Sequence, residues 1–406
     1  MAQGDLAMKR TELLLKQARI SLIPDKWSIA RVGDCCSIRN DLRKPLSINE
    51  RSLIQGEYPY YGPTGVLDYL NEFLVEGEFA LIGEDGDHFL KPNEKPQTIF
   101  AQGRFNVNNH AHLIESTGNC SSQWFAVFFK HRNITNFLSR QGANRYKLNK
   151  ATLEKLPLLL PPIPEQKAIA DLLSTWDEAI GKTERLIRAK ERQKIGELHS
   201  RISCQKANST IGSFAKQVIR KVDKPDESYV ALGIRSHFKG TFQRLVEDPK
   251  TVNMDSLYRV KENDLIVNIT FAWEGAIALV KTEDEECYVS HRFPTYVIRR
   301  SKAEPYFIRQ LIMSSRMKYD LSNISPGGAG RNRVLNKKDF LKMPIWLPEL
   351  KTQKDIGEYL GAIDNEIDLL KQLAEKYKTQ KRGLMQKMLT GEWRIAPDVA
   401  KTYEEM

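Results

Sequence analysis

The sequence predicts a mixed α/β (α+β) protein in which two globular domains alternate with two long helices. Three observations lead to this prediction. A long segment occurs twice, each copy contains a short apolar strand followed by prolines, and each copy ends in a helix with heptad spacing. A chain of 406 residues is also longer than one ordinary hydrophobic core requires, which favours more than one domain.

The two copies are related by a constant offset of 187 residues. The stretch LPLLLPPIPEQKAIADLL at 156–173 corresponds to MPIWLPELKTQKDIGEYL at 343–360, and ungapped matches continue on both sides. This period exceeds the 20–50 residues of a solenoid repeat, so it indicates one duplicated module. Duplication predicts an internal pseudo-twofold relation between the two copies.

Each copy has the same junction between a strand and a helix. A short apolar strand, at 158–160 and again at 345–347, meets prolines, which end a strand because they cannot donate a ladder hydrogen bond. Pro164 suits the first turn of the first helix, and Thr352 is a plausible N-cap for the second. The expected boundaries are 1–160 and 206–350 for the domains, 161–205 and 351–392 for the helices, and 393–406 for a C-terminal tail.

Both helices carry an apolar stripe at alternating spacings of three and four residues. As one helix, residues 353–390 would be about 57 Å long at about 1.5 Å per residue. The stripes predict that the helices pack on each other as an antiparallel coiled coil, and the alternative is that each packs on its own globular domain. The stripe residues proposed for this contact, or for contact with a partner, are Ile169, Leu173, Trp176, Ile180, Ile356, Leu360, Ile363, Ile367 and Leu370.

Charge and cysteine content narrow the functional class. The net charge is +11, and residues 204–352 alone hold 25 basic and 17 acidic side chains, which favours a polyanionic partner. The five cysteines form no Cys-x-x-Cys pair, so neither a disulfide framework nor a zinc knuckle is expected. No apolar run reaches the ~20 residues of a membrane span, and the N-terminal stretch lacks signal-peptide features. We expect a cytoplasmic protein that does not enter a membrane.

Several loops carry the residue types that read DNA, namely Arg and Lys for guanine and phosphates, and Asn and Gln for adenine. The strongest are SRQGANRYK at 139–147 and SPGGAGRNR at 325–333, because both copies place Gly, Asn and Arg just before the closing strand. The aromatic loop at 58–65, the stretch at 234–240 and the region of Trp273 are weaker candidates, and each loop is alternatively an ordinary turn. The candidate DNA-binding residues are Tyr60, Tyr61, Arg140, Gln141, Asn144, Arg145, Lys147, Arg235, His237, Lys239, Arg331, Asn332 and Arg333.

In this combination of features the sequence resembles the DNA-specificity subunits of Type I restriction–modification enzymes. The resemblance covers about residues 20–390. It rests on the duplication, the heptad helices and the Pro-Glu-Gln-Lys helix start. The segments at 58–86, 105–114, 260–280 and 288–299 are also similar to segments of target-recognition domains in that family.

The resemblance implies that each domain reads one half of a bipartite sequence in double-stranded DNA. The long helices would set the spacer and dock two modification subunits that bring S-adenosylmethionine. Two restriction subunits would add an ATP- and magnesium-dependent motor and nuclease. The chain itself would catalyse nothing and hold no cofactor. A related system in which methylation and cutting share one partner chain is a close alternative.

Two rival functions come from other classes. A magnesium-dependent nuclease would need Glu84, Asp85 and Asp87 of GEDGDH to gather a cation, although this run also fits a hairpin turn. The sequence contains no P-loop, no Asn/Asp-Pro-Pro-Tyr methyltransferase motif and no G-x-G-x-x-G. The other rival is a coiled-coil adaptor that binds only protein.

Overall fold

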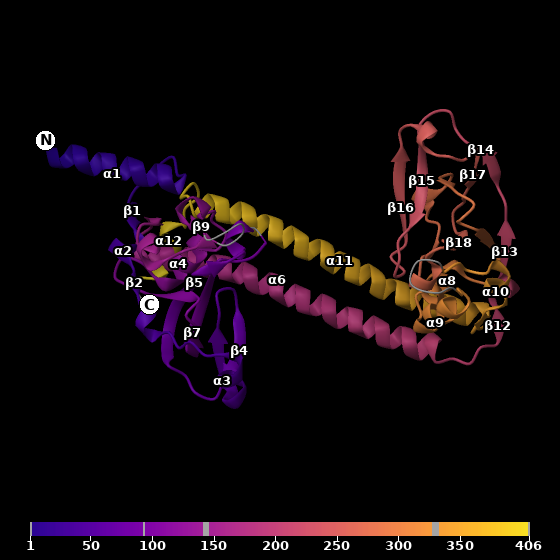
Figure 1. Cartoon of the computed structure of the whole chain (residues 1–406), viewed down its shortest axis with the longest axis horizontal. Helices are drawn as coiled ribbons and strands as arrows, with labels where there is room; N and C mark the ends of the chain where they lie inside the picture. The colour runs from indigo at the N-terminus through magenta and orange to yellow at the C-terminus, as the bar shows by residue number, and fades with distance from the viewer. Residues whose placement is uncertain (1, 92–93, 141–145, 327–332, 405–406) are drawn as a thin grey trace. The chain divides into compact units, whose positions relative to one another are not determined.

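The computed structural model describes residues 2–91, 94–140, 146–326 and 333–404 (Figure 1). The chain divides into two compact units. Unit 1 comprises Met1–Lys182 and Glu375–Met406, and unit 2 comprises Thr183–Ala374. The division passes through both long helices, α6 (Ile163–Leu198) and α11 (Leu350–Met388), so each unit contains one part of each helix. The expected boundaries, which set each helix apart from the domains, stay a prediction.

Unit 1 is built on a six-stranded sheet whose central strand is buried on both faces. The strand order is β2 (Ser37–Ile38), β8 (Ala111–Glu115), β5 (Val75–Gly83), β7 (Thr98–Val107), β3 (Gln55–Tyr61) and β4 (Val66–Leu70). In β5, Ala80 and Ile82 join the cluster beneath α4 (Ser122–Phe129), whereas Phe79 and Leu81 join a second cluster with Phe105. Successive side chains of a strand point to opposite faces, so this division gives β5 two covered faces.

Among its described residues, unit 2 contains two larger sheets and one two-stranded pair, β12 (Ser209–Thr210) with β22 (Pro344–Ile345). The five-stranded sheet has the order β14 (Lys221–Asp223), β17 (Ser256–Arg259), β20 (Tyr288–Val289), β15 (Tyr229–Ile234) and β16 (Thr241–Val246). The four-stranded sheet has the order β13 (Ala215–Val218), β21 (Thr295–Ile298), β18 (Leu265–Val267) and β19 (Ile277–Leu279).

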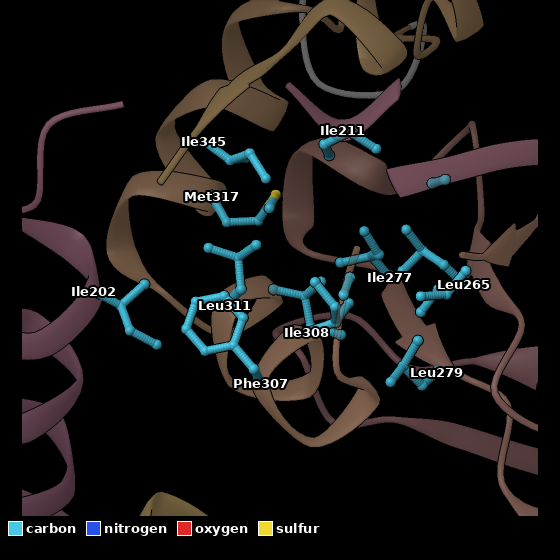
Figure 2. Packing of buried hydrophobic residues seen from close by; sticks show 14 of the residues in the cluster. Ile202, Ile211, Leu265, Ile277, Leu279, Phe307, Ile308, Leu311, Met317 and Ile345 are labelled. Carbon is cyan, nitrogen blue, oxygen red and sulfur yellow. The ribbon is translucent and has the colours of Figure 1, made fainter. Parts of the chain in front are cut away.

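The core of unit 2 lies between the four-stranded sheet and three helices, α8 (Pro305–Ile312), α9 (Ser315–Asn323) and α10 (Lys337–Lys342). Figure 2 shows Phe307, Ile308 and Leu311 of α8 directed into this cluster, with Ile277 and Leu279 of β19 on the other side. The remaining α-helices within the described residues are α1 (Ala2–Ala18), α2 (Val32–Cys35), α3 (Ile48–Leu53), α5 (Lys150–Leu153), α7 (Ile211–Phe214) and α12 (Pro397–Thr402).

The strand–proline–helix junction forms in both copies. In unit 1, β11 (Pro157–Leu160) pairs antiparallel with β1 (Ser28–Arg31), and in unit 2, β22 (Pro344–Ile345) pairs antiparallel with β12 (Ser209–Thr210). The second strand is shorter than expected. Pro164 lies in the first turn of α6 as predicted. Thr352 is not an N-cap, because α11 begins two residues earlier, at Leu350.

A buried glutamine joins each long helix to its globular partner. The side-chain carbonyl of Gln166 accepts from the backbone N–H of Ser121 at the start of α4, and its amide donates to the carbonyls of Pro161 and Asn119. Gln353 repeats this pattern in unit 2, accepting from the N–H of Glu304 and donating to Pro348 and Lys302. The glutamine of the repeated Gln-Lys pair therefore ties the start of each helix to its domain.

The long helices pair in antiparallel orientation in each unit. In unit 1, Trp176 packs edge-on against Tyr377 with ring centroids 5.7 Å apart. In unit 2, Lys190 pairs with Glu366 at 2.8 Å, and Lys194, one turn further along α6, pairs with Asp364. Later residues of α6 therefore lie opposite earlier residues of α11, so the two helices run in opposite directions. This confirms the predicted antiparallel coiled coil.

The alternative prediction is that each long helix packs on its own globular domain, and the structure shows this packing as well. Ile169 and Leu173 belong to the core of unit 1, and Ile356, Leu360 and Ile363 belong to the core of unit 2. The outer turns of each helix therefore pack on a domain. None of the helices within the described ranges is long and apolar enough to span a bilayer.

Candidate nucleic-acid interface

In unit 1 the structure joins two stretches that the sequence had singled out separately. Asp85–Gly86 (β6), Tyr146–Lys147 (β10) and Ser139–Arg140 (β9) form a small antiparallel sheet, in which Tyr146 pairs with Gly86 on one side and with Arg140 on the other. The acidic turn therefore pairs with Tyr146–Lys147, the last two residues of the basic stretch. The candidates Gln141, Asn144 and Arg145 lie outside the described residues.

Glu84 is the centre of the network behind this sheet. Its carboxylate lies 2.7 Å from Nη1 of Arg43 and 3.3 Å from Nζ of Lys147, and its backbone carbonyl accepts from the N–H of Leu148 at 2.7 Å. Burial raises the pKa of Glu84, but the charges and hydrogen bonds of Arg43, His112 and Lys147 outweigh burial, so the net pKa is lowered. The carboxylate is therefore ionised at neutral pH and holds Lys147 beside β6.

The three carboxylates of the nuclease hypothesis do not converge. Glu84 is bound to Arg43, Asp85 lies 3.0 Å from Nδ1 of His110, and Asp87 pairs with Lys95 at 2.8 Å. Over the described ranges, no three His, Cys, Asp or Glu side chains are placed to hold a metal ion. A magnesium site at GEDGDH has no support from this geometry.

The prediction of a DNA contact by Tyr60 requires correction. Tyr60 has no accessible surface; its hydroxyl donates to the carbonyl of Lys44 at 2.8 Å and accepts from the N–H of Leu46 at 3.0 Å. A side chain in this position braces the segment 44–46 and cannot touch a ligand. Tyr61 is half-buried, with its ring edge-on to Phe105, and its contact with DNA stays a prediction.

In unit 2 the tip of the hairpin between β15 and β16 is strained and exposed. His237 and Phe238 both have positive φ values, of 61° and 58°, which cost roughly 1–3 kcal/mol each for residues other than glycine. Their N–H groups donate to the carbonyls of Glu274 at 2.8 Å and Gly275 at 3.0 Å, which hold the tip in place. Strain of this kind is concentrated at functional sites.

Arg235, His237 and Lys239 are all exposed at this tip. Arg235 donates from Nη1 to the carbonyl of Thr241 at 2.6 Å and lies over the ring of Phe242, at 4.9 Å from its centroid. Its guanidinium is thereby oriented while the side chain stays open to solvent. The three candidates therefore occupy one surface.

Arg333, the last residue of the second basic stretch, contacts the turn that holds this hairpin tip. Its guanidinium lies 5.2 Å from the ring centroid of Trp273 and donates to the carbonyls of Ser322 at 2.8 Å and Ser325 at 3.0 Å. Trp273 belongs to the short 3₁₀ turn Ala272–Glu274 (η6), which also holds the hairpin tip. Hairpin, Trp273 and Arg333 thus meet at η6, and the candidates Arg331 and Asn332 lie outside the described residues.

Two organising residues were missed by reasoning from the sequence. Arg43 binds the carboxylate of Glu84, which lies 41 positions further along the chain. Glu274 accepts hydrogen bonds from the N–H of His237 and, at 2.7 Å, from the hydroxyl of Ser236. Neither belongs to a periodic pattern or a motif. Their roles depend on contacts between segments that are distant in the sequence.

Comparison with known proteins gives consistent results. The family model described as "Type I restriction modification DNA specificity domain" matches residues 24–190 and 234–378. The chain is 22% identical to the type I restriction enzyme MjaVIII specificity subunit of Methanocaldococcus jannaschii, over 92% of this chain and 94% of that protein. It is 34% identical over 142 residues to the type I restriction enzyme specificity subunit S.HindORF215P of Haemophilus influenzae, a match that spans 35% of each chain.

A solved structure with the same fold is the S subunit of a Type-I restriction-modification system from M. genitalium. The TM-score is 0.61 at 12% sequence identity, with 91% of this chain and 98% of that chain covered.

Proposed function

The chain belongs to the Type I restriction modification DNA specificity domain family, and we propose that each of its two units reads one half of a bipartite target in double-stranded DNA. The family model matches one segment in each copy of the duplicated module, and membership gives the chain a DNA-sequence-specificity role in a Type I restriction–modification complex. Two copies of one reading module suit two half-sites on the same duplex.

The observation that carries this proposal is that basic side chains of both units lie on well-braced supports. In unit 1, Glu84 holds Lys147 next to β6; in unit 2, η6 holds the hairpin with Arg235 and Lys239. Readers of base edges must be positioned closely, because a bidentate contact to a base requires two hydrogen bonds at once. Residues on such supports can combine base contacts with phosphate contacts that set the register.

We assign the long helices a second role, as the spacer between the half-sites and as the docking surface for partner chains. On this proposal two modification subunits bring S-adenosylmethionine, and two restriction subunits bring the ATP- and magnesium-dependent motor and nuclease. This chain contributes recognition and no catalytic group. The version in which one partner chain both methylates and cuts leaves the role of this chain unchanged.

Two experiments separate this proposal from its rivals. If the chain is a nuclease, the purified wild-type chain cuts DNA with magnesium and Asp85→Asn abolishes cutting; our proposal predicts no cutting by either. If the chain is a protein-only adaptor, the complex binds DNA no better when the chain is included. Our proposal predicts sequence-dependent affinity that falls steeply with salt, because Lys and Arg displace counterions from phosphates.

The decisive test is methylation mapping of the source genome by single-molecule sequencing, with the gene intact and deleted. We expect a bipartite adenine-methylated motif to disappear on deletion and to return when the gene is restored. Replacing residues 206–350 by the equivalent domain of a relative should then change one half of that motif. A change in both halves would show that the two units do not read independently.

A further inference from the structure

The two units share a core of four strands. In unit 1 the strands β2, β8, β5 and β7 are neighbours in this order, and in unit 2 the order is β13, β21, β18 and β19. Each neighbouring pair is antiparallel in both sets. The duplication that the sequence shows at the closing strand and the long helix therefore extends to the sheet of each unit.

Backbone hydrogen bonds identify residues that correspond at one end of these strands. Leu148 and Leu335 are counterparts at the offset of 187 residues. The N–H of Leu148 donates to the carbonyl of Glu84 at 2.7 Å. The N–H of Leu335 donates to the carbonyl of Ile269 at 2.9 Å. Glu84, after β5, therefore corresponds to Ile269, after β18.

The same residues lead to a second correspondence, just before the next strand of each sheet. The N–H of Glu84 donates to the carbonyl of His110 at 2.8 Å. The N–H of Ile269 donates to the carbonyl of Arg292 at 3.0 Å. His110, which precedes β8, and Arg292, which precedes β21, therefore occupy the same place in the two copies.

The strand register supports this assignment independently. In unit 1, the residue three positions before Glu84 pairs with the residue three positions after His110 in the antiparallel ladder. In unit 2, the same steps from Ile269 and from Arg292 again lead to a ladder pair. The correspondence therefore does not depend on the hydrogen bonds alone.

The turn before each of the two strands has the same construction. The side-chain oxygen of Asn108 accepts from the N–H of His110 at 2.8 Å. The hydroxyl of Ser290 accepts from the N–H of Arg292 at 3.3 Å. Different residue types thus hold the two backbone positions in the same way.

Both positions lie beside the basic stretches proposed to read DNA. The leucines that identify the correspondence directly follow the stretch at 139–147 and lie two positions after the stretch at 325–333. In unit 1, Asp85 pairs with Lys147 in the small sheet and lies 3.0 Å from Nδ1 of His110. The position of His110 and the last residue of the first basic stretch therefore meet at one strand end.

The side chains at the two positions are exposed nitrogen donors. The side chain of His110 is 49% exposed. Arg292 is exposed too, and no carboxylate of the described residues forms an ion pair with its guanidinium. Neither residue belongs to a hydrophobic cluster. Packing therefore does not explain why both copies carry a nitrogen donor here.

We propose that His110 and Arg292 are corresponding phosphate contacts, one in each half-site of the DNA. This inference rests on the proposed function and adds two contact residues to it. The phosphate backbone is the same in every half-site, whereas the bases differ. A phosphate contact can therefore keep one position in two modules that read different bases, and such contacts set the register of a protein on the duplex.

The chemistry of both side chains suits a phosphate better than a base. A base edge is read by two hydrogen bonds at once, which requires an oriented group, and the Arg292 guanidinium has no ion pair among the described residues to orient it. A phosphate accepts a cation without this requirement. In its imidazolium form His110 donates through both nitrogens, from Nδ1 to Asp85 and from Nε2 to the phosphate.

The test is fluorescence anisotropy of the assembled complex, between 50 and 200 mM salt, on a duplex that carries the mapped methylation motif. We expect Arg292→Ala to weaken binding about tenfold, the loss typical of one charge-assisted hydrogen bond. The slope of log K against log salt should fall by about 1, on the motif and on random-sequence duplexes alike. His110→Ala should have the same effect, and the double variant should reduce the slope by about 2.

Two further variants make the test specific. Arg300→Ala removes an exposed arginine that follows β21, at the opposite end of the strand from Arg292, and should leave the slope unchanged. Arg292→Lys should keep the wild-type slope, because a phosphate accepts the point charge of lysine, whereas a bidentate base contact would be lost. Circular dichroism melting checks that each variant folds, and Arg292→Gln replaces Arg292→Ala if that variant does not.

Three results would overturn this inference while leaving the proposed function intact. Arg292→Ala binds the motif with the same slope as Arg300→Ala, or His110→Ala has no effect where Arg292→Ala has one, or methylation mapping of cells with Arg292→Ala shows a changed base in one half-site. Failure of the wild-type complex to bind its own motif would instead refute the proposed function, and this inference with it.

Discussion

Asp177 of α6 forms an ion pair with Lys381 of α11, and their counterparts in the repeat exchange roles, since Lys194 of α6 pairs with Asp364 of α11. Each copy of the module thus gives its aspartate to the lysine of the other copy. Reciprocal contacts of this kind are the signature of an isologous twofold interface. The duplicated chain therefore exchanges partners between its two long helices, one ion pair in each unit, in the way that two identical helices would.

Removing one partner of such a pair should destabilise the chain, because the other charge remains buried. Lys381 is buried, and Asp177→Ala would leave it beside Lys130. We expect a loss of about 1–3 kcal/mol in the free energy of unfolding, measured by urea denaturation with tryptophan fluorescence. The pair Asp177→Leu with Lys381→Met should recover most of this loss, since two apolar residues leave no unpaired charge.

The exposed pair Glu191–Lys371 provides the control for this prediction. Both side chains are about half exposed, so Lys371→Ala should cost less than 1 kcal/mol. Equal losses for Lys371→Ala and Asp177→Ala would contradict the role assigned to the buried pair.

Gln166 should contribute more than an ordinary helix residue. The side chain has no accessible surface, and Gln166→Ala would leave one backbone N–H and two carbonyls of unit 1 without their partner. We expect a loss of about 2–4 kcal/mol, because each buried group left unsatisfied costs roughly 1–3 kcal/mol and neighbouring costs do not add fully. Gln380→Ala, an exposed glutamine on α11, should change the unfolding midpoint little; a similar loss there would refute the bracing role of Gln166.

Much of the fold could be predicted from the sequence because its main features are local or repeated. Heptad spacing, the strand–proline–helix junction and the offset of 187 residues are visible without knowing any contact. The division of both long helices between two units could not be predicted from the sequence, because it depends on which helical turns contact a globular core. The spacing of Ile169 and Leu173 is the same whether they pack on a helix or on a domain, and they do the latter.

The candidate sites were predicted from residue types alone. Arg235, His237 and Lys239 are exposed in the structure, as contact with DNA requires, and their role in DNA binding stays a prediction. The error at Tyr60 has a physical reason. The run YPYY in β3 offers no alternation of polar and apolar residues, so the sequence does not tell which face is buried.

Stability of unit 1 should decrease as the pH falls below neutrality because of His112. The imidazole is buried, and its Nε2 lies 2.7 Å from the carbonyl of Leu148. Burial, with the charges of Arg43 and Lys147, lowers the pKa of His112 despite the opposing effects of the hydrogen bond to the Leu148 carbonyl and of the charge of Glu84. The unfolded chain therefore binds a proton at His112 at a higher pH than the folded chain does. The contribution of the neutral imidazole to stability is fully present above the unfolded pKa of about 6.5. It is lost as the pH falls from there toward the lower pKa of the folded chain.

The measurement is the urea midpoint at pH 7.5 and pH 5.5. His112→Gln should reduce the difference between the two midpoints, and His110→Gln, at an exposed position, should preserve it. Burial also lowers the pKa of His88, which accounts for pH dependence that remains in His112→Gln. An unchanged difference in His112→Gln would show that this histidine is not the source.

Lys239 and Arg333 should behave differently in DNA binding. Lys239 is exposed on the hairpin tip, so Lys239→Ala should weaken binding to all sequences about equally and reduce the slope of log K against log salt by about 1. Arg333→Ala removes the contact with Trp273 and two hydrogen bonds to carbonyls, so it should lower stability by about 1–2 kcal/mol and affect one half-site.

Fluorescence anisotropy between 50 and 200 mM salt, on the assembled complex, distinguishes these outcomes. The exposed Lys318 of α9 serves as the control, and Lys318→Ala should leave the slope unchanged. If Lys239→Ala leaves the slope unchanged as well, the hairpin tip does not contact phosphates.

If the long helices set the spacer, lengthening both by one heptad should change the spacer and nothing else. Seven residues inserted after Lys182 in α6 and after Ala374 in α11 keep the apolar stripe in phase, because the heptad is the period of the stripe. Each helix would become about 10.5 Å longer at about 1.5 Å per residue, which corresponds to about three base pairs of 3.4 Å each. Methylation mapping should then show the original half-sites separated by a longer spacer. An insertion of four residues in α6 alone is the matched control: it shifts Lys194 out of register with Asp364, so it should abolish methylation. A seven-residue variant that methylates the original motif with its original spacing would exclude the helices as the element that sets the spacer.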